Sequence, residues 1–131
     1  MAQKRTKPRL KKLSIIIPVF NEEKWIIELL RKVNAAKTAG MKKEIIVVDD
    51  CSSDSTGVLL SQNRRLYTRL IRHCRNMGKG AAVRTGLCAA GGDVLFVQDG
   101  DLEYDPADYP AVVGPILDGV ADVVFGSRFL G

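Results

Sequence analysis

The chain has 131 residues, of which 46% are hydrophobic and 27% charged, and this composition favours one globular domain. The net charge of +5 comes from residues 1–12, which hold six Lys and Arg side chains and no acid, so the remaining body offers no basic surface for nucleic acid. No apolar stretch approaches the roughly 18 residues of a membrane span, and three cysteines without a Cys-x-x-Cys pair favour reduced thiols in the cytoplasm.

Residues 1–12 are expected to form a basic, disordered leader, and residues 13–131 are expected to form one folded domain. Two interpretations of the leader stay open. It is either a solvated tail or a patch that binds anionic lipid headgroups. The second interpretation would place a cytoplasmic protein at the cytoplasmic face of a membrane.

Apolar runs of strand length alternate with helical segments along the body. Strands are expected over residues 13–20, 44–48, 66–72, 94–97 and 120–125. Helices are expected over residues 22–39, 55–64 and 81–90, with another that opens at Pro106. Asn21 is expected to cap the first helix and Gly40 to end it, because a short polar side chain and a glycine favour these two positions.

The expected strands are apolar runs without a polar face, and this feature decides the fold class. Such strands are buried on both sides, so the sequence predicts an α/β fold with a mainly parallel sheet covered by helices on both faces. Polar clusters follow the strands over residues 13–20, 44–48 and 94–97. Because ligands bind at the carboxyl ends of parallel strands, a binding site is expected where these clusters meet.

The densest acidic cluster follows the strand over residues 94–97 and contains Asp99, Asp101 and Glu103, with Gly100 between the first two. Three acids within five residues repel one another unless a cation lies among them. Carboxylate oxygens suit Mg²⁺ or Mn²⁺, and phosphate oxygens of a substrate supply further ligands. The alternative is a solvated acidic turn that caps the helix at Pro106.

A second acidic pair, Asp49 and Asp50, ends the strand over residues 44–48. A carboxylate there can accept a hydrogen bond from a nucleobase N–H or a ribose hydroxyl. The alternative is turn chemistry, in which Asp and Ser side chains bond their own backbone and Asp54 caps the next helix.

The glycine-rich stretch over residues 76–86 is not a standard phosphate motif. His73 and Val83 stand where a Walker loop and a dinucleotide fingerprint need glycine, so a Rossmann dehydrogenase is not favoured. Lys79 and Arg84 either meet a diphosphate near this helix N-terminus or are surface cations. Arg128, after the last expected strand, is of the type that pairs with phosphate through two hydrogen bonds.

Five segments in this order resemble the family 2 inverting glycosyltransferases, in particular the branch of dolichyl-phosphate mannose synthase and the polyprenyl-phosphate glycosyltransferases. They are residues 17–23 (IPVFNEE), 47–56 (VVDDCSSDST), 76–82 (NMGKGAA), 98–106 (QDGDLEYDP) and 126–129 (GSRF). The resemblance covers residues 13–131. It departs from the common pattern at Gly100, where alanine is frequent, and at Cys51, where glycine or asparagine is frequent. A cysteine fits there if the backbone does not need a positive φ.

The resemblance implies a Rossmann-like GT-A fold and a role for each matched residue. The positions that hold the nucleoside are Pro18, Phe20, Glu22, Val48 and Asp50. The metal and diphosphate positions are Asp99, Asp101 and Glu103. Gly100 would contact the nucleotide-sugar, and Arg128 would contact the diphosphate or the acceptor phosphate. Asp101 and Arg128 are therefore the expected catalytic residues.

The implied reaction is a single displacement that transfers a sugar from a GDP- or UDP-sugar, with inversion, to a polyprenyl or dolichyl phosphate at a membrane surface. Mg²⁺ or Mn²⁺ is the implied cofactor. Family members continue past the Ser-Arg-Phe segment, so this domain is expected to be truncated at its C-terminus. One alternative is a non-catalytic or inactive fragment that binds a nucleotide-sugar. A nucleotidyltransferase is less favoured, because residues 18–23 are not a basic, glycine-rich loop.

Overall fold

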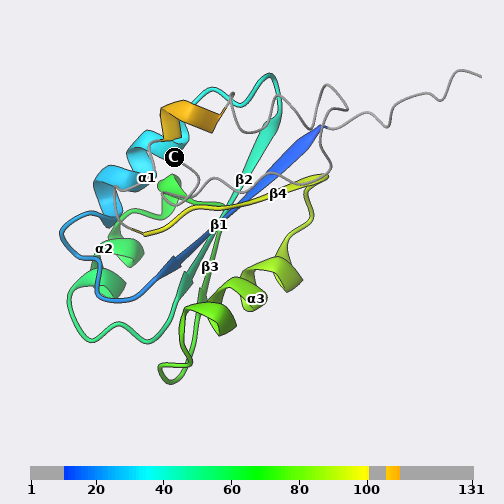
Figure 1. Ribbon diagram of the computed structural model, residues 1–131. Helices are drawn as coiled ribbons and strands as arrows, with labels where there is room; N and C mark the ends of the chain where they lie inside the picture. The colour runs from blue at the N-terminus through cyan, green and yellow to red at the C-terminus, as the bar shows by residue number, and fades with distance from the viewer. Residues whose placement is uncertain (1–10, 101–105, 110–131) are drawn as a thin grey trace, which may run out of the picture.

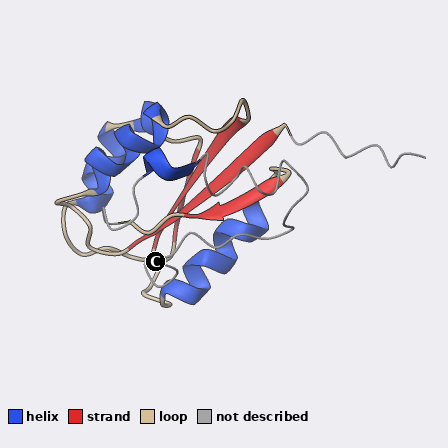
Figure 2. Cartoon of the chain, turned by 45° about the horizontal axis from the view of Figure 1, so that its top comes forward, coloured by secondary structure: helices blue, strands red, loops and turns tan. Residues whose placement is uncertain are grey.

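The structure is a computed structural model that describes residues 11–100 and 106–109. Its strands are β1 (Lys12–Val19), β2 (Lys42–Asp49), β3 (Arg69–Arg72) and β4 (Val94–Val97). Its helices are α1 (Ile26–Ala35), α2 (Thr56–Gln62) and α3 (Lys79–Ala89), with 3₁₀ turns η1 (Arg64–Leu66) and η2 (Pro106–Asp108) (Figure 2). The expected strand over residues 120–125 and residues 1–10 of the leader expected over residues 1–12 lie outside the described residues. The last residue of that expected leader, Lys12, begins β1 instead.

The four strands form one parallel sheet in the order β3-β2-β1-β4. The chain steps outward from β1 to β2 and β3, and then crosses back to add β4 on the other side of β1. Helices α1 and α2 cover one face of the sheet and α3 covers the other (Figure 1). The predicted α/β class with helices on both faces is confirmed. The reversal of strand order between β1 and β4 is a topological switch point, where such sheets bind ligands.

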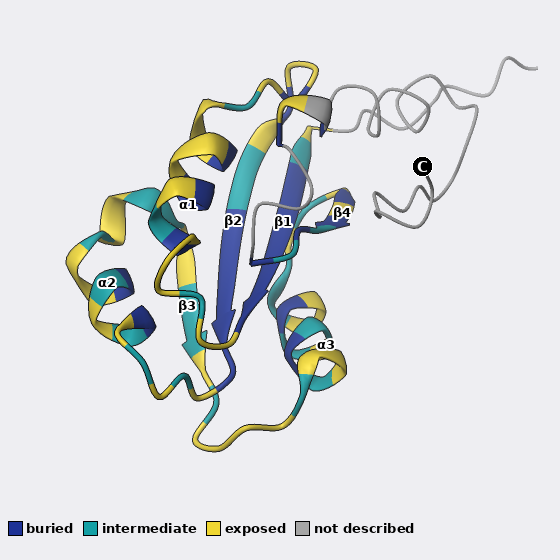
Figure 3. Cartoon of the chain, turned by 60° about the vertical axis from the view of Figure 1, so that its left-hand side comes forward, coloured by how far each residue is buried: buried dark blue, intermediate teal, exposed yellow. Residues whose placement is uncertain are grey.

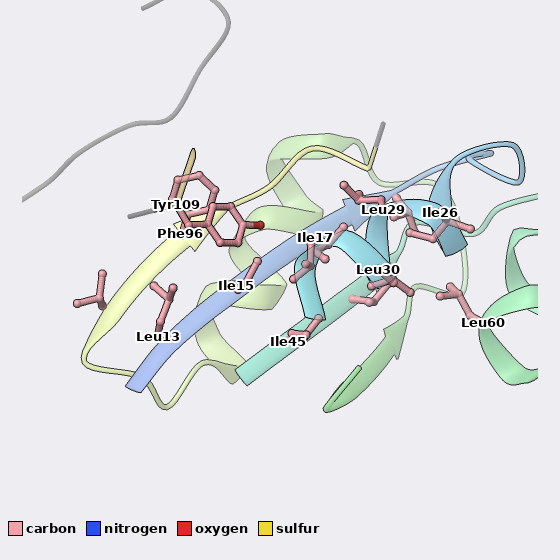
Figure 4. Packing of buried hydrophobic residues seen from close by; sticks show 14 of the residues in the cluster. Leu13, Ile15, Ile17, Ile26, Leu29, Leu30, Ile45, Leu60, Phe96 and Tyr109 are labelled. Atoms are coloured by element: carbon pink, nitrogen blue, oxygen red, sulfur yellow. The ribbon is translucent and has the colours of Figure 1, made fainter. Parts of the chain in front are cut away.

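Burial on both faces explains why the central strands are unbroken apolar runs (Figure 3). On the α1 face, alternate residues of β1 pack with residues of α1, β2, β4 and η2 (Figure 4). On the α3 face, a smaller cluster joins Ile46 and Val48 of β2 to Ala82 of α3. In the described ranges no helix is long and apolar enough to cross a membrane.

Helix α1 begins later than the sequence predicted. Its first residue is Ile26, and the preceding Trp25 has a side chain that is 44% exposed. The expectation that Asn21 caps this helix is wrong. Asn21 adopts a positive φ of 52°, and its side-chain oxygen accepts a hydrogen bond from the N–H of Ser53 at 2.8 Å.

Helix α1 also ends earlier than predicted, at Ala35 instead of at Gly40. The cause is a cation from the next strand. The Lys43 ammonium donates hydrogen bonds to three carbonyl groups at this helix end, those of Val33, Asn34 and Ala36. The Val33 carbonyl also accepts the N–H of Ala36 at 3.3 Å. Carbonyls in the last turn of a helix lack the usual helical partners, and a positive charge at a helix C-terminus is favourable. Gly40 instead serves the turn into β2 with a φ of 83°.

The third strand is shorter than predicted, because it starts at Arg69 instead of Leu66. Residues 64–66 form η1, in which the N–H of Leu66 donates to the carbonyl of Asn63. The hydroxyl of Tyr67 then donates to the carbonyl of Leu60 at 2.8 Å, so the segment after η1 is tied to the end of α2 before it enters the sheet.

A partly buried carboxylate, that of Glu44, joins three segments at the amino end of the sheet. Glu44 accepts hydrogen bonds from the hydroxyl of Ser14 at 2.7 Å and the N–H of Gly91 at 2.8 Å, and it pairs with the Lys12 ammonium at 2.9 Å. Burial alone would raise the pKa of Glu44, but the contacts with Gly91, Lys12 and Ser14 outweigh it and lower this pKa to about 2.

We expect Glu44→Gln to destabilise the fold by roughly 2–3 kcal/mol at neutral pH. The pKa of Glu44 is about 2 in the folded chain against 4.5 for a free side chain, so folding favours the charged form. This contribution is present above pH 4.5 and is lost as the pH falls from 4.5 to 2. Urea unfolding at a series of pH values checks it. A stability difference that stays constant down to the lowest pH would contradict the assignment.

Candidate functional site

An open cavity of about 330 Å³ lies at the carboxyl ends of β1, β2 and β4, next to the switch point of the sheet. Six of the residues that the resemblance matched to the donor site line it: Pro18, Phe20, Glu22, Asp50, Asp99 and Gly100. Its opposite wall is the segment that leads into α3, with Asn76, Gly78, Lys79 and Ala82. The carboxyl ends of three strands and the N-terminus of one helix therefore meet at the cavity.

The remaining predicted site residues fall elsewhere. Val48 is fully buried in the cluster between β2 and α3, and its side chain does not line the cavity. Asp101, Glu103 and Arg128 lie outside the described residues, so their roles stay predictions. Asn76 and Ala82 were not singled out from the sequence, because an amide and a small apolar residue carry no chemical signal of their own.

The loop after β1 and the loop after β2 hold each other by a set of hydrogen bonds, here termed the loop clamp. It joins residues 21–23 to residues 52–56. The N–H groups of Asn21, Glu22 and Glu23 donate to the side chains of Ser52, Thr56 and Asp54 at 2.9, 3.0 and 3.3 Å. In return, the N–H groups of Ser53 and Ser55 donate to the side chains of Asn21 and Glu23 at 2.8 and 2.9 Å.

The loop clamp explains why these two segments are rich in Asn, Asp, Ser and Thr. Each short side chain accepts a hydrogen bond from an N–H group in the other loop, as Asx and Ser/Thr side chains do in turns. Asp54 was expected to cap α2, but the N-cap is Ser55, and Asp54 supports the helix start from one residue earlier by accepting the N–H of Thr56 at 2.9 Å. The clamp fixes the backbone on both sides of Phe20 and Glu22, which line the cavity.

Cys51 has a φ of 62°, so the condition under which a cysteine suits this position is not met. A side chain in this left-handed region costs on the order of 1–2 kcal/mol relative to the usual backbone conformation, and glycine or asparagine reduces this cost. The strain follows from the clamp, because the chain must reverse between Asp50 and Ser52 for the two loops to meet.

Asp50 is 3% exposed and is the polar centre of the cavity wall. Its Oδ1 accepts the N–H of Met77 and contacts Nδ1 of His73, both at 2.8 Å, and its Oδ2 accepts the N–H of Gly78 at 2.9 Å. Burial would raise the pKa of Asp50, but these contacts outweigh it and lower the pKa below its ordinary value. The carboxylate is therefore ionised, and it holds the segment before α3 against the end of β2.

Asp99 lies after β4, beside the N-terminus of α3. Its carboxylate is 37% exposed and pairs with the Lys79 ammonium. The preceding residue, Gln98, is fully buried, and its side-chain oxygen accepts the hydroxyl of Tyr109 at 2.7 Å. The segment that carries Asp99 is therefore anchored by Tyr109, which directly follows η2. An added Cβ at Gly100 would lie 2.9 Å from Cγ1 of Val19, so the loop after β1 packs closely on this segment.

The described residues fit a divalent cation in one respect. Asp99 offers a hard oxygen ligand at the cavity, where its carboxylate pairs with the Lys79 ammonium. Within residues 11–100 and 106–109, no group of three His, Cys, Asp or Glu side chains is placed to hold a metal. A single carboxylate agrees with the coordination of Mg²⁺, which takes one or two carboxylates and completes its shell with water and substrate phosphates.

A polar cavity at the switch point of a parallel sheet, with a carboxylate beside a helix N-terminus, is an arrangement in which α/β domains bind nucleotides. The family model for glycosyl transferase family 2 matches residues 14–131. The chain belongs to this family. It is 37% identical over 119 residues to an undecaprenyl-phosphate 4-deoxy-4-formamido-L-arabinose transferase of Salmonella paratyphi A, covering 88% of this chain and 36% of the relative. It is 36% identical over 120 residues to a dolichol-phosphate mannosyltransferase of Pyrococcus furiosus, covering 91% of this chain and 34% of the relative.

Solved structures of GT-A glycosyltransferases share the fold. S. aureus TarS in complex with UDP superposes with a TM-score of 0.70 at 28% identity, over 82% of this chain and 32% of that chain. Glucosyl-3-phosphoglycerate synthase of Mycobacterium tuberculosis, in complex with Mn²⁺, UDP and its product, superposes with a TM-score of 0.66 at 26% identity, over 82% of this chain and 40% of that chain. The chain thus spans about a third of the length of the curated relatives it matches.

Proposed function

We propose that the cavity binds a nucleoside-diphosphate sugar, either a GDP- or a UDP-sugar, and that the sugar is transferred with inversion to a polyprenyl or dolichyl phosphate. One observation carries the proposal: six residues from three separate segments, each matched to a donor-binding position of the family, line one cavity. The names of the relatives support the acceptor, because two of them are transferases that act with undecaprenyl phosphate and dolichol phosphate.

The donor is bound by groups of three kinds in this proposal. Phe20 is 44% exposed at the cavity, and an exposed aromatic ring is a stacking surface for a nucleobase. Asp50 accepts an N–H of the base. The N-terminus of α3 begins at Lys79 on the cavity wall, where free backbone N–H groups and the helix dipole favour a diphosphate.

In the proposed reaction, an oxygen of the acceptor phosphate attacks the anomeric carbon from the side opposite the diphosphate. The bond from that carbon to the diphosphate oxygen breaks as the new bond forms, and the configuration inverts. A lipid phosphate is already anionic, so no residue needs to remove a proton from it. A bound Mg²⁺ or Mn²⁺ would neutralise charge on the departing diphosphate. Asp99 would hold it, with Asp101 and Glu103 as further predicted ligands and Arg128 as a predicted partner of the phosphates.

Calorimetric titration of GDP and of UDP into the folded chain, first with Mn²⁺ and then with EDTA, tests the donor site. We expect one nucleotide to bind at least about tenfold more tightly with Mn²⁺, which is about 1.4 kcal/mol. Absence of binding of either nucleotide to a folded sample would overturn the proposal for this chain.

A transfer assay with a labelled sugar nucleotide and undecaprenyl phosphate separates transfer from binding alone. Labelled lipid would support the transferase. Donor binding without labelled lipid or sugar release would mean that the chain is a nucleotide-sugar-binding part of the family without activity of its own. Release of pyrophosphate from a nucleoside triphosphate and a sugar phosphate would instead indicate a nucleotidyltransferase.

A further inference from the structure

His73 is the only histidine of the chain, and it lies behind the cavity wall, directly after β3. Its side chain is 8% exposed. Both ring nitrogens have partners: Nδ1 is 2.8 Å from Oδ1 of Asp50, and Nε2 is 2.8 Å from the hydroxyl oxygen of Thr85 on α3. Its backbone N–H donates to the carbonyl of Asp49. His73 therefore connects β2, β3 and α3 at one point.

The direction of these hydrogen bonds follows from the charge of Asp50. An ionised carboxylate only accepts, so Nδ1 of His73 carries a proton and donates it to Oδ1. This holds whether the ring is neutral or charged. In the neutral ring, Nε2 accepts the hydroxyl proton of Thr85, and this contact fixes the plane of the imidazole.

His73 determines how the lone pairs of Asp50 are used. An ionised carboxylate has about four acceptor positions. Within the described residues, His73 and the N–H of Met77 occupy two positions on Oδ1, and the N–H of Gly78 occupies one on Oδ2. One position on Oδ2 is left, in a residue that lines the cavity. Without the donor at Nδ1, only the N–H groups of Met77 and Gly78 orient the carboxylate, so both its aim and the anchoring of residues 77–78 are weakened.

We propose that His73 is a positioning residue of the nucleotide site, which acts through Asp50. It aims the remaining acceptor position of Asp50 at an N–H donor of the bound nucleobase, and it holds the segment over residues 76–79 as a rigid wall of the cavity. The inference rests on the proposed function. In this inference His73 does not contact the nucleotide, but it sets the orientation of Asp50, which does.

Two substitutions at His73 separate positioning from simple packing. The side-chain amide nitrogen of asparagine stands as many bonds from the backbone as Nδ1, and that of glutamine as many as Nε2. His73→Asn therefore keeps a donor for Asp50 and loses the contact with Thr85, while His73→Gln does the reverse. Both remove the ring, so their thermal stabilities should fall by similar amounts.

The experiment combines amide hydrogen exchange of Met77 and Gly78 in the nucleotide-free chain with titration of GDP and UDP in the presence of Mn²⁺. For His73→Gln we expect about tenfold faster exchange at these two amides and about tenfold weaker nucleotide binding. For His73→Asn we expect both values to stay within about threefold of the wild type. Equal effects of the two substitutions, or unchanged binding in His73→Gln, would overturn the proposal.

A second pair of variants covers the case in which neither His73 variant folds. Thr85→Val removes the hydroxyl that orients the ring, and Thr85→Ser keeps it. We expect a severalfold weaker nucleotide affinity in Thr85→Val only, and equal affinities in the two variants would overturn the proposal. If the wild type binds neither nucleotide, the proposed function fails and His73 loses its role in it. If the wild type binds a nucleotide normally and the paired variants do not differ, only the proposed role of His73 fails and the proposed function stands.

Discussion

Replacing Asp99 with asparagine is expected to weaken manganese-dependent nucleotide binding at least about 100-fold while the chain stays folded. The amide removes the negative charge at the cavity, and a unit charge pair at ~4 Å is worth on the order of 4 kcal/mol at an effective dielectric near 20. The side chain is 37% exposed, and among the described residues its carboxylate pairs with Lys79 alone, so its loss costs the fold little. Titration of Mn²⁺ and of the nucleotide into the variant measures the effect.

Asp93→Asn is the matched control for this variant, because Asp93 precedes β4 and Asp99 follows it. The carboxylate of Asp93 accepts the N–H groups of Lys11 and Lys12 at 3.0 and 3.1 Å, at the end of the sheet opposite the cavity. We expect its nucleotide affinity to equal that of the wild type. A folded Asp99→Asn variant with normal manganese-dependent binding would show that Asp99 does not hold the metal.

Replacing Gly86 with alanine is expected to destabilise the fold by about 2–3 kcal/mol, as overpacking in a dense core does. Gly86 lies on the face of α3 that packs against β1. An added Cβ would come within 2.3 Å of Cγ2 and 3.1 Å of Cγ1 of Ile16. Ile16 is fully buried in the central strand, and its β-branched side chain has little rotamer freedom to move away. The helix must therefore shift, and urea unfolding measures the cost.

Gly80→Ala in the same helix provides the comparison. Apart from the adjoining backbone of α3, no atom of the described residues lies within 4 Å of a Cβ added at Gly80, so alanine there should stabilise the helix by about 0.5–1 kcal/mol. The two substitutions make the same chemical change in one helix and should act in opposite directions. Equal stabilities of the two variants would mean that α3 does not pack as closely on β1 as described.

The sheet could be predicted from the sequence because its signal is local. Each central strand is buried on both faces, so its sequence is an apolar run, and the run alone indicates a parallel sheet. The carboxyl ends of such strands lie at one edge, which is why Pro18, Asp50 and Asp99 were expected to lie together. Their common position at one cavity follows from topology and does not depend on the details of packing.

The features that the sequence did not predict depend on partners far along the chain. Asn21 has the side chain of a helix cap but bonds residues of the loop after β2. The end of α1 is set by Lys43, which belongs to the next strand. The positive φ of Cys51 follows from the meeting of two loops. In each case a local preference was overridden by a tertiary contact.

The proposed role of His73 could not be predicted from the sequence either, because a single histidine outside a recognisable motif gives no functional signal. In the sequence, His73 stands out only as the residue at a position where a Walker loop needs glycine. Its contacts become visible only in the fold, which places Asp50 at the end of β2 and Thr85 of α3 on either side of the ring. Buried polar residues of this kind can be found only from their hydrogen-bond partners.

The loop clamp has a thermodynamic consequence for any molecule that enters the cavity. When a ligand must order flexible loops, the entropy lost by the loops makes binding less favourable. Here the backbone around Phe20 and Glu22 is already held by hydrogen bonds to residues 52–56. The loops that line the cavity are therefore preorganised, and the affinity of a ligand depends mainly on its contacts with the cavity. Cutting the clamp at Asn21 would then show as a less favourable binding entropy, with the contacts to the ligand unchanged.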